Sequence, residues 1–167
     1  MEVKKQSQET VQAMNPVVTL FLDFDGVLHP LHGGGARLQY APLLVSALKP
    51  HPDVQIVLST SWAVMFGLDE TKNMLPTLLR QRVVGATYDP KYARQEWLSS
   101  MTRYTQIAKY VKRHLLTHWL AVDDDDEGWP AEHRKSLVRT SSRLGLAHPD
   151  TLPELADKLQ RLQTAKQ

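Results

Sequence analysis

The sequence predicts a three-layer α/β fold, in which a Rossmann-like parallel sheet lies between helices on both of its faces. Short apolar runs rich in β-branched residues alternate with longer segments whose apolar residues recur at helical spacing, as in successive βαβ units. Polar residues directly follow several of these runs, and the ends of parallel strands are where such sheets bind ligands. The chain has 167 residues and no internal repeat, which is about the size of one domain.

The elements of the first half follow from these patterns. Residues 17–22 (VVTLFL) are apolar on both faces, which is typical of a central strand covered by helices. Residues 41–48 are expected to form a helix, and the prolines at 50 and 52 end it before a second strand at 54–58. A helical pattern over 69–82 and a short strand at 83–86 complete this half.

The second half contains the clearest amphipathic pattern of the chain. Apolar residues fall on one face over 102–116, which predicts a helix there. A strand at 118–122 then leads directly into four consecutive aspartates, and 136–139 is expected to be the last strand. Leucines at helical spacing predict a closing helix, with Asp150 or Thr151 as its N-cap.

Composition and the N-terminus set limits on the class of protein. Hydrophobic residues make up 42% and charged residues 23%, which is ordinary for a globular protein. The absence of cysteine excludes disulfides, thiolate zinc sites and cysteine nucleophiles, and it is compatible with a reducing, cytoplasmic location. Residues 1–15 lack the apolar core of a signal peptide, so we expect a flexible leader before a single domain over 16–167. No apolar run approaches the roughly 20 residues of a membrane span, and no membrane partner is expected.

The net charge is only +2, but basic residues are concentrated in the middle of the chain. Between positions 72 and 118 there are nine Lys or Arg residues and only two acidic residues, Asp89 and Glu96. Such a stretch would attract an anionic partner, which makes nucleic acid a candidate. Solvated helix faces are the simpler explanation.

Polar side chains follow three of the predicted strands. Asp23 and Asp25 come after the first strand, hydroxyl residues 59–61 after the second, and aspartates 123–126 after the strand at 118–122. Gly26 permits a sharp turn and a close approach of other groups. Carboxylates gathered at one sheet edge need a cation, and an all-oxygen donor set favours Mg²⁺. With one carboxylate as nucleophile, a second as proton donor, and hydroxyl and basic groups on phosphate oxygens, this set would suit phosphoryl transfer.

Residues 23–28 have the pattern Asp-x-Asp-Gly-x-Leu directly after an apolar strand. In this motif the chain resembles the haloacid dehalogenase (HAD) superfamily of phosphohydrolases. The second motif of that superfamily, an apolar strand ending in Ser or Thr, matches residues 56–61. Thr60 is chosen within it because a small residue follows, and Ser59 is the alternative.

The remaining two motifs of the superfamily also have counterparts. An apolar strand followed by paired acids matches residues 120–124, about one hundred residues after the first motif. A basic residue near a helix start should precede that strand; Arg103 fits best, with Lys91 and Arg94 as alternatives. An Arg in place of the commoner Lys keeps the charge but changes the geometry.

The resemblance implies a catalytic role for four residues. Asp23 would attack phosphorus to give an aspartyl-phosphate, while Asp25 would protonate the leaving group and then activate water. Thr60 and Arg103 would hold phosphoryl oxygens. The implied activity is that of a Mg²⁺-dependent phosphomonoester hydrolase.

The resemblance also implies a magnesium site and a substrate surface. Asp23, the backbone carbonyl of Asp25, and Asp124 would hold Mg²⁺ with Asp123 in support, although the choice among positions 123–125 is open by one residue. Further residues beside these motifs are expected to bind substrate: Gly26, Ser59, Ser61 and Trp62.

The lengths between motifs indicate an open site. About thirty residues separate the first two motifs, and residues 62–102 are used up by predicted elements, so neither gap holds a large cap. Open sites in this superfamily accept phosphoproteins or nucleic-acid ends as well as small phosphomonoesters. Ser-Thr-Ser-Trp at 59–62, Val-Gly-Ala-Thr at 84–87 and Gly-Leu at 145–146 are similar to capless HAD domains of RNA-repair proteins. The oligomeric state is left undefined.

Three alternatives remain open on the residues themselves. A phosphoryl-accepting signalling module would use similar groups, but its acid pair, hydroxyl and lysine occur in a different order along the chain. A metal-dependent nuclease could use the same acids. The histidine pairs His29 with His32 and His114 with His118 have spacings found in zinc sites, which the lack of cysteine disfavours.

Overall fold

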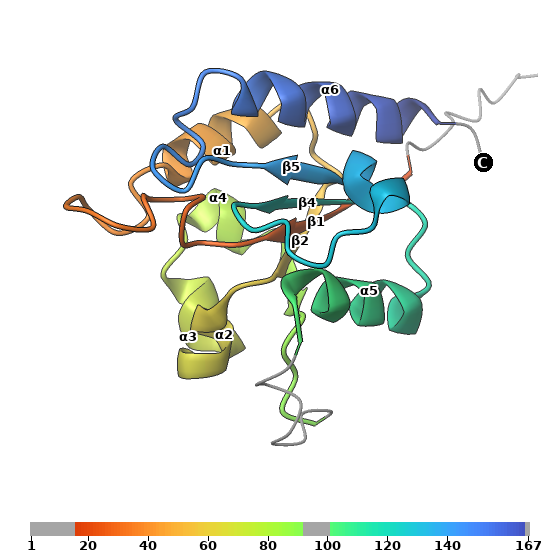
Figure 1. Cartoon of the computed structure of the whole chain (residues 1–167), viewed down its shortest axis with the longest axis horizontal. Coiled ribbons are helices and arrows are strands. Elements are labelled where there is room, and N and C mark those ends of the chain that lie inside the picture. The colour runs from red at the N-terminus through yellow and green to blue at the C-terminus, as the bar shows by residue number, and fades with distance from the viewer. Residues whose placement is uncertain (1–15, 92–100, 166–167) are drawn as a thin grey trace, which may run out of the picture.

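The structure is a computed structural model that describes residues 16–91 and 101–165 (Figure 1). The leader predicted at 1–15 lies outside the described residues. Within the described part, five parallel strands form one sheet in the order β3-β2-β1-β4-β5. The three-layer α/β fold predicted from the sequence is therefore confirmed.

The strands of the sheet are short and their ends are level. Their bounds are β1 Thr19–Leu22, β2 Gln55–Leu58, β3 Val83–Ala86, β4 Trp119–Asp123 and β5 Leu137–Arg139. Leu22, the last residue of the central strand β1, is in register with Leu58 of β2 and with Val122 of β4. The residues that follow these positions therefore emerge side by side at one edge of the sheet.

Helices cover both faces of the sheet. Helices α1 (Ala41–Leu48) and α6 (Thr151–Thr164) lie on one face and α5 (Arg103–His114) on the other (Figure 1). Because side chains alternate along a strand, Leu20 and Leu22 of β1 join the first core, and Phe21 joins the second. The second core also contains Ile107 of α5, which fixes the start of that helix relative to β1.

The region between β2 and β3 differs from the prediction of one helix over 69–82. It contains α2 (Ser61–Phe66), α3 (Leu68–Asn73) and α4 (Thr77–Arg80). Pro76 directly precedes α4, and proline cannot donate the backbone hydrogen bond that would continue α3. Helix α2 and the 3₁₀ helix η2 (Ala131–Ser136) were not predicted, because each is too short to show a clear period.

The helix predicted over 102–116 is confirmed, and it is shorter by one residue at its start and two at its end. Thr102 caps α5, since its Oγ1 accepts the N–H of Thr105 at 3.2 Å. Leu115 adopts a left-handed conformation (φ 53°) and ends the helix. The N-cap of α6 is Asp150, one of the two predicted candidates.

The described connections hold no large cap domain. A loop joins β1 to α1, and only the three short helices lie between β2 and β3. None of the helices in the described ranges has the length and apolarity needed to cross a membrane.

Candidate active site

Three aspartates converge at the edge where β1 and β4 end, and we call them the acidic cluster: Asp23, Asp123 and Asp124. Asp23 directly follows β1, and Asp123 is the last residue of β4. One carboxylate oxygen of each lies within 4.8 Å of the others. Asp23 is 4% exposed and Asp123 is 1% exposed, so two of these charges are almost removed from water. Level strand ends thus bring together acids one hundred positions apart, as the sequence predicted.

Arg103 is the cation beside this cluster. It is the first residue of α5, and its Nη2 lies 3.6 Å from Asp23 Oδ1 while its Nε lies 3.1 Å from Asp123 Oδ2. The contact with Asp123 is an ion pair without hydrogen-bond geometry, and that Oδ2 atom has no hydrogen-bond partner among the described residues. One guanidinium therefore faces three carboxylates.

Burial makes the negative charges of the acidic cluster unfavourable, and the pKa values of its aspartates rise. Burial raises the pKa of Asp23 to about 6, against the opposing effect of Arg103. The pKa of Asp123 and that of Asp124 are also raised, chiefly by burial. A divalent cation would neutralise these groups and supply the missing partner of Asp123 Oδ2, and carboxylate oxygens are the donors that Mg²⁺ prefers. The residues present therefore fit a magnesium ion.

Gly26 makes room for Asp124. Its φ of 71° lies in the left-handed region that favours glycine, and a Cβ atom at this position would collide with the carboxylate of Asp124. The glycine of the first motif therefore lets the two strand-end loops approach closely. Its contact with substrate stays a prediction.

The side chain of Asp25 has different partners from the cluster. Trp62 donates its Nε1–H to Asp25 Oδ2 at 2.9 Å, and Nε2 of His29 lies 3.0 Å from Asp25 Oδ1. Asp25 nevertheless lines the same cavity as the cluster. This cavity has a volume of about 440 Å³ and is lined by Asp23, Asp25, Leu31, Arg103, Asp123, Asp124, Asp125 and Ser142.

The hydroxyl residues after β2 reach the same sheet edge. The N–H of Ser59 donates to the carbonyl of Leu22 at 2.8 Å, which places Ser59 level with Asp23. The Thr60 side chain is buried and accepts the N–H of Trp62 at 3.4 Å, and so caps α2. Ser59 Oγ is buried without a partner in the described part of the chain, and Ser61 is exposed. Contact of these hydroxyls with a phosphate stays a prediction.

The four consecutive aspartates separate into different environments. Asp123 and Asp124 belong to the acidic cluster, whereas Asp125 is exposed and its N–H donates to Asp123 Oδ1 at 3.0 Å. Asp126 lies 2.8 Å from Arg134 Nη1 and 3.2 Å from Arg139 Nη1. The hydrogen bond from Arg134 lowers the pKa of Asp126. The geometry therefore favours Asp123 and Asp124 over Asp125 as ligands.

The alternatives for the basic residue and for zinc find less support. Lys91 is exposed, and its backbone N–H donates to Asp89, while Arg94 lies outside the described residues. His114 stacks on Tyr110, and His118 contacts Thr117. Among the described residues, the group of side chains placed to hold a metal ion is the acidic cluster, which contains no histidine.

Sequence reasoning missed three residues of this region. His29 was considered only as a zinc ligand, although its position four residues after Asp25 in a loop was a usable signal. Leu31 and Ser142 line the cavity because the N–H of Leu31 donates to the carbonyl of Ser142 at 2.8 Å. A contact between loops so far apart leaves no sequence pattern.

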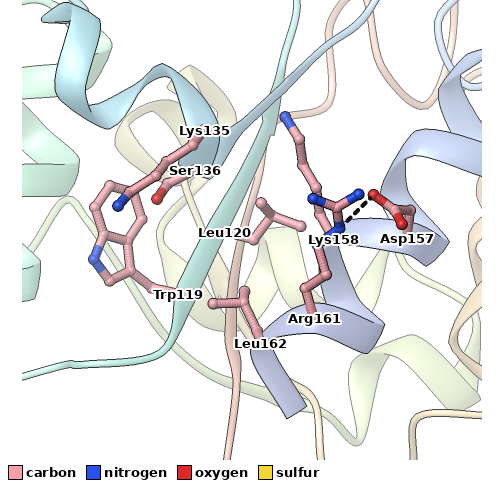
Figure 2. A pocket seen from close by; sticks show the side chains of 8 residues that line it. All are labelled: Trp119, Leu120, Lys135, Ser136, Asp157, Lys158, Arg161 and Leu162. Atoms are coloured by element: carbon pink, nitrogen blue, oxygen red, sulfur yellow. Dashed lines mark ion pairs between the residues drawn. The ribbon is translucent and has the colours of Figure 1, made fainter. Parts of the chain in front are cut away.

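A second cavity, of about 320 Å³, lies near the other end of the strands (Figure 2). Trp119 begins β4 and Ser136 precedes β5, so both belong to the amino-terminal edge of the sheet. Helix α6 supplies the opposite wall with Lys158 and Arg161. Lys158 Nζ donates to the Leu137 carbonyl at 2.6 Å. Lys158 also pairs with Glu154, and Arg161 pairs with Asp157.

The comparisons with known proteins agree with this geometry. A family model described as the HAD domain in Swiss Army Knife RNA repair proteins matches residues 19–151, which include all five strands and the acidic cluster. No curated protein and no solved structure matches the chain. Since that one family model covers most of the sequence, the chain belongs to the HAD superfamily, in the family of HAD domains from Swiss Army Knife RNA repair proteins.

Proposed function

We propose that the chain is a Mg²⁺-dependent phosphomonoester hydrolase that works through an aspartyl-phosphate on Asp23. Membership of the HAD superfamily indicates a phosphohydrolase-type function. The observation that carries the finer proposal is the acidic cluster, in which three carboxylates converge, two of them almost fully buried, beside the guanidinium of Arg103. A nucleophile, a metal-binding donor set and an anion-binding arginine would then meet in one cavity.

The first half of the reaction would transfer the phosphoryl group to the protein. Asp23, Asp123 and Asp124 would hold Mg²⁺, which when bound lowers the negative charge that an incoming phosphate meets. A carboxylate oxygen of Asp23 forms the bond to phosphorus as the bond to the leaving-group oxygen breaks. Asp25 gives its proton to that oxygen, and Arg103 offsets charge on the phosphoryl oxygens.

The second half would return the protein to its starting state. Asp25, now a carboxylate, takes a proton from water as the water oxygen attacks phosphorus. The bond between phosphorus and Asp23 breaks, and inorganic phosphate leaves. Asp25 is again protonated, so the net reaction is hydrolysis of a phosphomonoester.

We place a phosphorylated nucleic-acid end first among the substrates, before a phosphoprotein or a small phosphomonoester. The family description names RNA repair proteins, and the described residues hold no cap domain over the cavity. The basic stretch that includes α5 would suit a polyanion.

A phosphate-release assay would test this proposal. The full chain is offered a nitrophenyl phosphate, a phosphopeptide and oligonucleotides with 3′- or 5′-phosphates, each with Mg²⁺ and with a chelator. We expect Mg²⁺-dependent phosphate release, fastest from an oligonucleotide end. Chelator-resistant release, or activation by Zn²⁺ and not by Mg²⁺, would contradict the metal assignment.

The same assay separates the alternative functions. Cleavage of unphosphorylated labelled strands without phosphate release would indicate a metal-dependent nuclease. A stable phosphoprotein that forms without turnover would indicate a signalling module. Asp126→Asn is the matched control for variants of the cluster, because Asp126 is paired with Arg134 and Arg139 instead.

A further inference from the structure

We infer that Trp62 and His29, which we call the donor pair, are positioning residues that orient the carboxylate of Asp25 for proton transfer. The inference rests on the proposed function, in which Asp25 is the acid and base. Trp62 comes from α2 and His29 from the loop after β1, so the donor pair joins two separate segments around one carboxylate.

The donor pair uses both oxygens of Asp25. Trp62 Nε1–H donates to Oδ2 at 2.9 Å, and His29 Nε2 lies 3.0 Å from Oδ1. The backbone N–H of Leu38 donates to His29 Nδ1 at 3.4 Å, which leaves the proton on Nε2 for donation to Asp25. With one donor on each oxygen, rotation of the carboxylate about its Cβ–Cγ bond would break two hydrogen bonds.

The donors are themselves held in place. Trp62 is 8% exposed, and its ring packs edge-to-face on Phe24, with ring centroids 5.5 Å apart. Phe66 packs on the same ring at 6.1 Å. The guanidinium of Arg37 lies 5.6 Å from the centre of the indole, a cation–π contact that draws electron density from the ring and favours donation by its N–H.

This arrangement separates two kinds of carboxylate in one cavity. Asp25 is two residues from Asp23 and lines the same cavity, so an unrestrained Asp25 side chain could turn toward a cation held by the acidic cluster. Among the described residues, the side chains placed to hold a metal ion are Asp23, Asp123 and Asp124, and Asp25 is not one of them. The donor pair keeps the carboxylate of Asp25 on the side of Trp62 and His29, where it is reserved for the leaving group. A general acid works only within hydrogen-bond reach and in the right orientation.

Trp62→Phe tests the inference, because it removes the N–H donor and keeps an aromatic ring against Phe24. We expect kcat to fall about 10-fold on an alkyl phosphate and by less than about 2-fold on a nitrophenyl phosphate, whose leaving group needs little proton transfer. KM should change little on either substrate. Trp129→Phe is the matched control, because the buried Nε1 of Trp129 has no hydrogen-bond partner among the described residues, and we expect unchanged kinetics.

Two further variants show whether the donor pair acts through Asp25. His29→Gln keeps an N–H donor and should retain more activity on the alkyl phosphate than His29→Ala. In an Asp25→Asn background, Trp62→Phe should cause no further loss. Equal losses from Trp62→Phe and Trp129→Phe, or full additivity with Asp25→Asn, would overturn the inference.

A measurement independent of activity completes the test. The indole N–H proton of Trp62 in an NMR spectrum should shift in Asp25→Ala, while that of Trp129 should not. An unmoved Trp62 signal would overturn the donor pair even in an active enzyme. A folded wild type without phosphatase activity would overturn the proposed function and the positioning role with it, and the NMR result would then describe a structural contact only.

Discussion

The two ends of the sheet carry cavities of similar size and opposite chemistry. At the carboxyl-terminal edge, about 440 Å³ is lined by carboxylates with Arg103 as their cation. At the amino-terminal edge, about 320 Å³ is lined by basic side chains from α6 and from the segment before β5. In the second cavity two of the basic side chains are paired: Lys158 lies 2.7 Å from Glu154, and Arg161 lies 2.9 Å from Asp157 (Figure 2).

The two cavities differ in how far their charges are buried. Exposed pairs such as Arg161 with Asp157 are solvated, and they lose little when the cavity is empty. Asp23 and Asp123 are buried, and their raised pKa values express an uncompensated charge. Substitutions at the two ends should therefore have very different consequences.

The largest effect is expected from Asp23→Asn. This change keeps the shape of the side chain but removes the oxygen proposed as the nucleophile, so turnover should fall by more than about 10³-fold. Phosphate release from a nitrophenyl phosphate measures the loss, with thermal unfolding as the check on folding. Substantial activity in a folded Asp23→Asn protein would place the nucleophile elsewhere.

Asp25→Asn should distinguish the role of Asp25 from that of Asp23. Loss of proton transfer should reduce activity on an alkyl phosphate by about 10² to 10⁴, and by less on a nitrophenyl phosphate. The second step of the proposed mechanism also needs Asp25 as base, so a phosphoprotein should accumulate with the activated substrate. Equal losses on both substrates, with no trapped intermediate, would mean that Asp25 serves only the metal.

The pH dependence of stability provides a smaller effect. In the metal-free protein the pKa of Asp23 is about 6 against an ordinary 3.8, so the folded form holds this proton more tightly than the unfolded form. The contribution of Asp23 to the free energy of unfolding should then fall as pH rises from about 4 through 6. The Asp23→Asn variant should show a flatter profile, and an identical profile in both proteins would contradict the raised pKa.

Magnesium should reverse this loss. Binding requires ionised carboxylates, so Mg²⁺ should raise the melting temperature more at pH 7.5 than at pH 5. At a concentration one hundred times its Kd, the stabilisation would be about 2.7 kcal/mol. Equal shifts at the two pH values would place the ion away from the acidic cluster.

The smallest effect is expected at the opposite cavity. Arg161→Ala removes an exposed ion pair with Asp157, worth about 1 kcal/mol or less, and leaves the acidic edge untouched. Activity should stay within about twofold of the wild type. A large loss of activity in a folded Arg161→Ala protein would show that the two ends of the sheet are coupled.

The sequence was a sufficient guide to the sheet and to the acids at its edge. Strands such as β3 were predictable because each has a local apolar pattern. The proximity of Asp23 and Asp123 was predictable because the carboxyl ends of parallel strands lie at one edge of the sheet. The donor pair was not predictable in this way. Trp62 was expected beside the site, but its hydrogen bond to Asp25 depends on the short helix α2, whose period is too brief to recognise.

Sequence patterns also could not distinguish among the four aspartates at 123–126. Their identical side chains become different only through tertiary contacts, such as the space over Gly26 for Asp124 and the arginines beside Asp126. The break at Pro76 was visible in the sequence, but leucines on both sides continued the helical period across it.

The loop that bears Asp25 is anchored by residues made much later in the chain. The hydroxyl of Thr140 donates to the carbonyl of Gly26 at 2.7 Å, across 114 positions, and the N–H of Leu146 donates to the carbonyl of Val27 at 2.9 Å. During synthesis the first strand leaves the ribosome long before these partners exist. These hydrogen bonds need Thr140 and Leu146, which follow β5, so the geometry of the loop depends on the C-terminal part of the sheet. A growing chain that already carries Asp23 and Asp25 still lacks two of the hydrogen bonds that hold the loop after them.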